Sequence, residues 1–577
     1  MPNDSRGRRF FAEPDARSCL AAGCGSRSAD RAWTRFREPR WNRQSLEWLK
    51  LDRWLDQGDL ARKIARLVDE DLDLDSLFSS YAGRGTPPHR PDLLLKLVLY
   101  EHQTGRPKPT QWLEDLNKNK AVEWLTFGIE VGRSVLYEFR DRVLPFLREL
   151  NTQVVRTAID EKHTDASMAS LDGTFIAANA SRHRLLTLKK VEERLDLLEQ
   201  EIAKPEAVEV SQQEPQLDET LQASVIAEAA PAQAEAEPNQ QSSATQSSSA
   251  GPTATRHRGR SFMGKTKCGM ERQRAQYRKA QEILTERSKT NAQRRKDKRT
   301  TLDEIRVAIG DPTAPFGRDK TKVFRPIYNV QEMTDLSTDL VFSYGVFTNL
   351  SDAGLLVPMI DLTQEVIRQL LKKVFTDSGY PSGDDLAECK ARQVDVYAPW
   401  NENSHTAEKR AQAGEDGPIR KDQFIWDPVT QCYRCPQGNS LTYTGRTTKQ
   451  KANGDYMSLE IYQSDPADCK ECPFKDRCVH STSGARTVRR QRNEDLIDEM
   501  RDRMKTPEGK ALYGLRGCTV ERRFADEKTH RAFQRFSGRT IERAEAQVGL
   551  TVLAHNLITL DKLRKKGGGA QKSLENA

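Results

Sequence analysis

Apolar residues recur at helical spacing through the first part of the chain. Leu60 and Ile64 lie one helical turn apart, and Pro91 opens the apolar run LLLKLVLY as a proline at the start of a helix does. Ser134 is predicted to cap a further helix. Short helices separated by Gly and Pro, with Arg and Lys between them, predict a helical DNA-binding domain over 44–160. A plain helical bundle is the alternative.

The period changes near residue 166, where apolar and polar positions begin to alternate. Residues 167–180 predict a strand with a turn or hairpin bend at Asp172-Gly173, and a helix should follow over 185–202. From about residue 322, two strands, an amphipathic helix, a short strand ending in Asp377, a helix and another strand predict a parallel pair. The carboxyl end of such a strand is where open α/β sheets place their chemistry.

Three segments lack the composition of a packed core. Residues 1–43 are rich in Arg, Ser, Gly and Ala without a period, and 564–577 resemble a frayed tail. Between 205 and 250 the chain holds eight acidic residues and no Lys or Arg. This composition cannot bury enough apolar surface to offset the entropy of ordering. We therefore predict a disordered N-terminus, a disordered linker over 200–255 and a disordered tail.

The charge then changes sign. Residues 251–300 carry sixteen Lys or Arg against four Asp or Glu, a local net charge of 16 − 4 = +12. A run this concentrated is unusual for a solvated face, and it predicts a basic helix over 256–300 that contacts phosphates.

Over the whole chain, 92 Lys and Arg against 84 Asp and Glu give a net charge of +8, with a pI near 8.8. The balance favours a polyanionic partner, although an ordinary charged surface fits the totals equally well. No run of about eighteen apolar residues occurs, and the first residues lack the apolar region of a secretory signal. We expect no membrane partner and a cytoplasmic location.

Three acidic residues on separate predicted elements are candidates for phosphodiester chemistry: Asp172, Asp377 and Glu521. Cleavage needs an activated nucleophile and neutralisation of the leaving oxygen, and two Mg²⁺ ions held by carboxylates supply both. Each residue also has a simpler interpretation, as a turn residue, a helix cap and a surface acid. Glu527 is the nearest rival to Glu521.

Three blocks carry a family resemblance: LDGTFIAANASRHR, FTDSGYPSGDDLAECKARQVDVYAP and TVERRFADEKTHRAFQRF. In this order they resemble the active-site blocks of the DDE transposases of bacterial insertion sequences, and PPHRPDLLLKLVLYEHQTGRP is similar to the N-terminal domain of that family. The resemblance spans roughly residues 48–560. It implies a ribonuclease-H-like mixed α/β sheet flanked by helices, formed by 161–400 and 501–563. It also implies Asp172, Asp377 and Glu521 as ligands of Mg²⁺ or Mn²⁺.

Many members of this broad group carry a Tyr, Arg, Glu, Lys signature around the glutamate. Arg516 precedes Glu521 by one residue more than the signature has, and Lys528 follows Glu521 by two helical turns on the same face. A cation at that position could hold a DNA phosphate beside the metals. The resemblance implies DNA contacts from Tyr513, Arg516, Arg522, Arg523 and Lys528.

The chain has ten cysteines, and five of them lie between 432 and 478. In a reducing compartment two CxxC pairs point to zinc, with five candidates for four ligand places and metal-free thiols as the alternative. The family pattern implies Cys435, Cys469, Cys472 and Cys478 as the zinc ligands and leaves Cys432 spare.

This cysteine-rich segment, 401–500, interrupts the gap of 521 − 377 = 144 residues between the second Asp and the Glu. Related transposases with such an insertion use it at the transposon end. Trp400 and Trp426 could stack on a flipped base there, although packing in the protein core is the simpler interpretation.

We therefore predict an endonuclease and strand-transfer enzyme that acts on double-stranded DNA, at transposon terminal repeats and in target DNA. Two ends need two active sites, so a homodimer on DNA, associated with the nucleoid, is expected. The alternatives are a nuclease that never integrates DNA, a catalytically inactive DNA-binding regulator derived from a transposase, and a zinc-stabilised structural protein.

Overall fold

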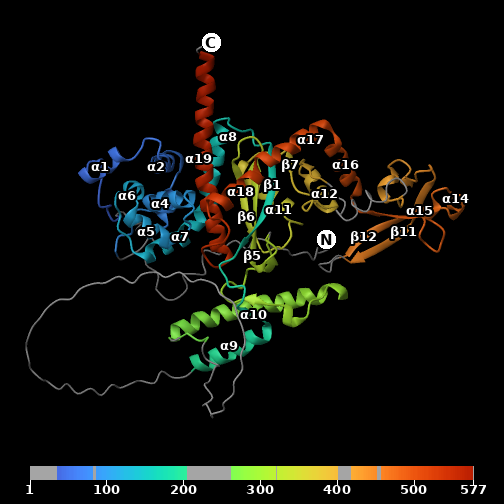
Figure 1. Cartoon of the computed structure of the whole chain (residues 1–577), viewed down its shortest axis with the longest axis horizontal. Coiled ribbons are helices and arrows are strands. Elements are labelled where there is room, and N and C mark those ends of the chain that lie inside the picture. Colours follow the sequence, from blue (N-terminus) through green and yellow to red (C-terminus); the bar gives the residue numbers. More distant parts are fainter. Residues whose placement is uncertain are drawn as a thin grey trace, which may run out of the picture. The chain divides into compact units, whose positions relative to one another are not determined.

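The computed structural model describes residues 36–81, 86–203, 262–264, 266–319, 321–399, 417–450 and 456–575 (Figure 1). Most of the predicted N-terminal and linker disorder, over 1–43 and 200–255, thus lies outside the described residues. The chain divides into two compact units: 1–182 with 314–451 and 455–577, and 183–313 with 452–454. None of the described helices is long and apolar enough to cross a membrane.

The first unit begins with short helices whose limits follow proline and capping signals. α4 (Pro91–Gln103) has its proline at the first position, as predicted, and Asp59 caps α2 (Leu60–Asp71). The helix predicted from Ser134 instead begins at Arg133, and a 3₁₀ turn containing Pro145 separates its two halves. The remaining helices here are α1 (Leu46–Trp54), α3 (Asp75–Ser79), α5 (Pro109–Lys118), α6 (Lys120–Leu125), α7 (Arg133–Val143) and α8 (Leu147–Asp160).

These helices share one continuous hydrophobic core with the main sheet. Leu97 and Leu99 of α4 are fully buried in it, as are Leu171 of the first strand and Leu550 and Leu553 of the last helix. α4 is buried at nearly every position, including the charged Asp92, Lys96 and Glu101, and it contacts both the neighbouring short helices and the last helix of the chain.

The main sheet has six strands in the order β4 (Phe316–Arg318), β5 (Phe324–Asp335), β1 (Met168–Ala177), β7 (Lys373–Phe375) and β8 (Asp395–Tyr397), with β6 (Val341–Phe347) also paired to β5. β1 runs antiparallel to β5 and parallel to β7. The predicted parallel pair is confirmed, since β7 and β8 are parallel. The fold is therefore mixed α/β.

The turn predicted at Asp172-Gly173 is absent. β1 runs straight through both residues, and Asp172 pairs with Glu332 and Gly173 with Gln331 on β5. Glycine is needed here for close approach, because a Cβ at residue 173 would lie 2.1 Å from Nε2 of Gln331. An Asp-Gly pair suggests a turn from sequence, whereas here it admits a neighbouring side chain.

The helices that pack against the main sheet come from distant parts of the chain. α11 (Leu356–Ile367) packs on β5 and β6, α18 (Val520–His530) on β1 and β5, and α19 (Ile541–Glu575) on β6, α4 and α8. α12 (Gly383–Ala391) links β7 to β8, and α16 (Glu494–Lys505), α17 (Pro507–Gly514) and a 3₁₀ turn η6 (Leu515–Cys518) lead into α18.

The tail predicted as disordered over 564–577 differs in the structure. α19 continues as one helix to Glu575, drawn in red in Figure 1. Arg564 pairs with Asp71 and Glu161, which ties the start of this segment to the helical region. The hydrophobic pattern ends before this segment, so periodicity carries no signal for these ion pairs.

The cysteine-rich segment forms its own antiparallel sheet, in which each strand pairs with the next: β9 (Ile425–Asp427), β10 (Cys432–Arg434), β11 (Ser440–Gln450), β12 (Tyr456–Ser464) and β13 (Thr487–Gln491). Two short helices, α14 (Pro466–Lys470) and α15 (Lys475–Cys478), lie between β12 and β13.

The second unit is built on two helices, α9 (Leu188–Ile202) and α10 (Lys267–Gln293). Val191, Leu195 and Leu198 of α9 pack against Tyr277 and Leu284 of α10. The predicted helix over 185–202 is confirmed as α9, and the basic helix expected within 256–300 is α10. The unit also holds the two-stranded pair β2 (Leu185–Leu186) and β3 (Val307–Ala308) and the 3₁₀ turns η2 (Lys296–Lys298) and η3 (Leu302–Glu304).

Candidate active site

The three predicted carboxylates come from three separate elements and meet in the first unit. Asp172 lies in the middle of β1, Asp377 lies two residues beyond the end of the neighbouring parallel strand β7, and Glu521 is the second residue of α18. Because β1 and β7 are parallel neighbours, a residue just past β7 reaches the face of β1. The packing of α18 on β1 brings the glutamate to the same place.

A single guanidinium joins the three carboxylates. Arg516 places Nη2 3.1 Å from Oδ1 of Asp172 and Nη1 3.2 Å from Oε1 of Glu521, and Nη1 also donates to Oδ1 of Asp377. Burial acts to lower the pKa of Arg516, but the surrounding carboxylates outweigh it and raise the pKa, so the group stays charged.

The acidic side chains are more open than the arginine. Those of Asp377 and Glu521 are each 56% exposed and that of Asp172 is 16% exposed, whereas the Arg516 side chain is only 3% exposed. The arginine therefore forms the base of the site, and the carboxylates form its open side.

The donor chemistry of this site fits a divalent cation. Carboxylate oxygens are the ligands that Mg²⁺ prefers, and all three residues already converge on one cationic group. Among the described residues, however, no group of three or more His, Cys, Asp or Glu side chains is arranged to hold a metal ion as it stands. The carboxylates are gathered around a guanidinium.

Tyr513 and Lys528 lie beside the carboxylates. The Tyr513 hydroxyl donates to the carbonyl oxygen of Thr376 at 3.3 Å, next to Asp377, and burial raises its pKa. Lys528 donates through Nζ to Oγ1 of Thr174, two residues after Asp172 on the same strand. A two-residue step along a strand keeps the same face, so Lys528 lies on the Asp172 side of β1.

The two arginines after Glu521 have different environments. Arg522 is exposed and pairs with Asp339. Arg523, which is predicted to contact DNA, is instead buried between two acids. Its Nε lies 2.6 Å from Oε2 of Glu332, and its Nη2 lies 2.7 Å from Oε1 of Glu527. Glu527, the rival to Glu521, is committed to this ion cluster and does not reach the site.

Glu332 is a buried neighbour of the site that was not among the predicted residues. It pairs across the sheet with Asp172 and is fully buried, and its partner Arg523 lies on the helix that carries Glu521. An acidic residue inside the otherwise buried strand IYNVQEM was the available signal, since such a residue requires a buried cation.

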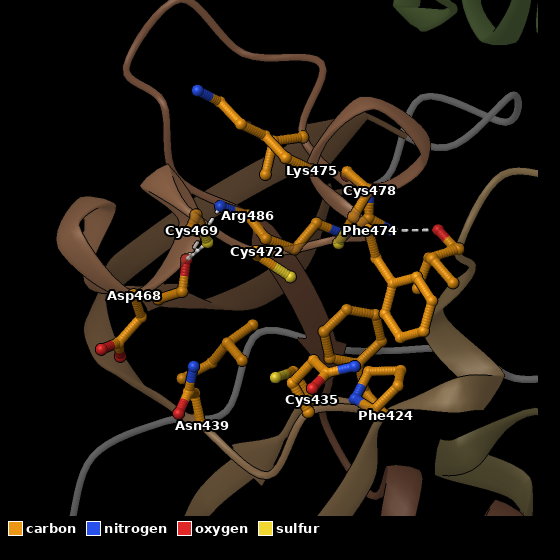
Figure 2. A pocket seen from close by; sticks show the side chains of 16 residues that line it. Phe424, Cys435, Asn439, Asp468, Cys469, Cys472, Phe474, Lys475, Cys478 and Arg486 are labelled. Carbon is orange, nitrogen blue, oxygen red and sulfur yellow. Dashed lines mark hydrogen bonds between the residues drawn. The ribbon is translucent and has the colours of Figure 1, made fainter.

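Four of the five clustered cysteines line one pocket beside the second sheet: Cys435, Cys469, Cys472 and Cys478 (Figure 2). Burial raises the pKa of the Cys478 thiol, and the three other cysteines of the pocket raise it further. Cys432 lies apart from the pocket lining, with its sulfur 3.0 Å from Oγ1 of Thr430.

Two family models match the chain. One, described as a transposase DDE domain, covers residues 434–561, and the other, a transposase domain (DUF772), covers residues 49–142. Both matches indicate an insertion-sequence DDE transposase. No curated protein and no solved structure matches it.

The two matched ranges leave the middle of this transposase uncovered. The DDE match includes the cysteine pocket, Arg516 and Glu521, whereas Asp172 and Asp377 lie outside both matched ranges. The geometry at Arg516 is therefore what connects these two aspartates to the matched glutamate.

Trp426 of the transposase is occupied by its own neighbours. The guanidinium of Arg490 lies 4.0 Å from the ring centroid, and the rings of Tyr433 and Tyr462 pack against the indole. Stacking on a flipped base would require Arg490 to leave. Trp400 lies outside the described residues.

Proposed function

We propose that this transposase cleaves DNA at transposon ends and joins the freed 3′ ends to target DNA. Asp172, Asp377 and Glu521 would hold two Mg²⁺ or Mn²⁺ ions. The observation that carries the proposal is the convergence of these three carboxylates, from β1, the loop after β7 and α18, on a single cation-binding point.

The sheet supports a ribonuclease-H-like catalytic domain. In chain order its five principal strands are β1, β5, β6, β7 and β8, and in space they run β6, β5, β1, β7, β8. The antiparallel β5 and β6 lie on one side of β1 and the parallel β7 and β8 on the other. The first aspartate then lies on the central strand and the second beyond the adjacent parallel one.

The metal ions and the side chains would have different roles in the reaction. Bound divalent ions supply an activated water or 3′-hydroxyl and neutralise the leaving oxygen. The carboxylates fix where that chemistry happens. Lys528, held on the Asp172 face of β1, is placed to bind a phosphate beside them, and the exposed Arg522 and the nearby Tyr513 would add contacts along the backbone.

Hydrolysis and strand transfer use the same site, because both are in-line attacks on a phosphodiester by an oxygen nucleophile. Two transposon ends require two such sites, so we propose that a homodimer assembles on DNA.

We also propose that Cys435, Cys469, Cys472 and Cys478 bind a structural Zn²⁺. Support comes from their shared pocket and from the separate location of Cys432, which leaves four thiols for four tetrahedral places. Zn²⁺ binding would displace the thiol protons, and coordination would hold the four thiolates around the ion despite their mutual repulsion. Such a site would stabilise the β9–β13 sheet without taking part in cleavage.

The experiment that tests the proposed activity is cleavage and joining of a plasmid that carries the gene's own flanking DNA, in Mg²⁺ or Mn²⁺. Wild type is compared with Asp377→Ala. Loss of both products in the variant, with DNA binding retained, supports the proposal. Equal binding by both proteins without any cleavage would favour a catalytically inactive regulator instead.

A further inference from the structure

Arg516 makes more contacts than an ordinary ion pair between one cation and one carboxylate. Its one guanidinium contacts three carboxylates that come from three elements, and Nη2 also lies 3.4 Å from the carbonyl oxygen of Leu171. One positive charge against three negative ones leaves a local charge of 1 − 3 = −2.

The local backbone is shaped to allow this contact. Arg516 and Glu521 are five residues apart, which on a continuous helix places side chains about 140° apart around the axis. Here the helix is interrupted: Arg516 lies in the 3₁₀ turn η6, and Thr519 has φ −110° and ψ −101° before α18 begins. The Thr519 hydroxyl donates to the carbonyl oxygen of Arg516 at 3.1 Å, which holds the break. The interruption turns both side chains to the same site.

We propose that Arg516 is the resident cation of the metal-free active site and competes with divalent ions for the same carboxylate oxygens. The inference rests on the proposed function, since it assumes that the carboxylates bind metal. Arg516 is a positioning residue in this role: it holds mutually repelling carboxylates together until metal ions replace it.

The guanidinium suits this role better than an ammonium would. It presents several N–H donors in a rigid plane, so two nitrogens can reach oxygens on opposite sides, as Nη1 and Nη2 do here. Its position at the base of the site leaves the open side of Asp377 and Glu521 accessible to ions arriving from solvent. Metal binding would loosen the arginine contacts in exchange for coordination.

The test is to measure Mn²⁺ binding to the full chain without DNA. The electron paramagnetic resonance signal of free Mn²⁺ reports how much of the ion remains unbound. Wild type, Arg516→Gln and Arg516→Lys are compared. Removing a positive charge beside a divalent ion should tighten binding by about tenfold or more in Arg516→Gln. Arg516→Lys keeps the charge and should stay within about threefold of wild type.

Thermal unfolding in EDTA provides a second readout. In EDTA, Arg516→Gln should unfold at a lower temperature than wild type, because three carboxylates lose their shared partner. With Mn²⁺ in place of EDTA, the unfolding midpoint of Arg516→Gln should rise by more than that of wild type. Binding by Arg516→Gln that is equal to or weaker than that of wild type would overturn the inference. If Arg516→Gln does not fold, Arg516→Lys decides, and a tenfold loss of Mn²⁺ affinity in it overturns competition.

A control separates this inference from the proposed function. Asp172→Asn, Asp377→Asn and Glu521→Gln combined should abolish the Mn²⁺ binding that wild type shows. If the combined variant still binds Mn²⁺ as wild type does, the metal site of the proposed function fails. If it does not bind, and Arg516→Gln has unchanged affinity, only the role of Arg516 fails.

Discussion

The buried ion cluster of Arg523, Glu332 and Glu527 gives the most quantitative prediction, for the substitution Arg523→Met. The side chains of Arg523, Glu332 and Glu527 are 3%, 0% and 1% exposed. Removing the arginine leaves a buried carboxylate without its cation. Breaking a buried pair in this way costs about 3–5 kcal/mol, a large part of the roughly 5–15 kcal/mol by which domains are stable.

The cluster is not symmetric between its two acids. Burial raises the pKa of Glu527, with Arg523 opposing and Glu332 reinforcing the shift. Glu527 should therefore be protonated at neutral pH. Glu527→Gln should cost less than about 1 kcal/mol at pH 7, because the amide replaces a carboxyl that is already neutral.

Tryptophan fluorescence during urea unfolding measures this loss in the correct part of the chain, because the six tryptophans among the described residues all lie in the first unit. The matched control is Arg522→Met. The Arg522 side chain is 69% exposed and pairs with Asp339, so its loss should lower the free energy of unfolding by less than about 1 kcal/mol. If the Arg523→Met protein is as stable as the Arg522→Met protein, the buried arginine does not stabilise the fold as its contacts imply.

Three further predictions concern other sites. Burial, with the nearby Asp115, raises the pKa of the fully buried Glu101 to about 9, so between pH 4.5 and 9 the folded state keeps a proton that the unfolded state loses. Wild type should therefore lose up to about 1.4 kcal/mol of stability per pH unit as pH rises in that window, and Glu101→Gln should not; parallel pH profiles in urea would contradict this. Gly173→Ala should destabilise the chain by about 1–3 kcal/mol, because its Cβ would displace Gln331 from its bonds to Asp352 and Tyr380, and an unchanged thermal midpoint would count against it. Wild type purified with zinc should hold one Zn²⁺ by elemental analysis, Cys435→Ser should lose it and Cys432→Ser should keep it; the reverse pattern would reject the assigned ligand set.

Local patterning predicted much of the architecture. The proline at the start of α4, the amphipathic α9 and the parallel strands β7 and β8 all carry signals within a few residues of sequence. The interruption at Thr519 carries none, because it depends on how η6 and α18 pack on the sheet. Element type was therefore easier to predict than the exact direction of a side chain.

The candidate site shows the same division. Residue type and order suggest Asp172, Asp377 and Glu521. Arg516, the partner that the three share, is predicted from sequence to contact DNA instead. Spacing alone could not show that Arg516 turns inward or that Arg523 pairs with Glu332, since both depend on contacts more than a hundred residues apart in the chain. The five cysteines left the ligand set open until the fold separated Cys432 from the others.

The most direct test of the central claim uses strand transfer from a pre-cleaved transposon end, which bypasses the first cut. Asp172→Asn, Asp377→Asn and Glu521→Gln each remove one charge with little change in shape, and Asp526→Asn on the same helix as Glu521 is the matched control. We expect each of the three to lower joining by about a hundredfold or more, while Asp526→Asn stays within about twofold of wild type. Near-normal joining by any one of the three would contradict the claim that these carboxylates form the catalytic centre.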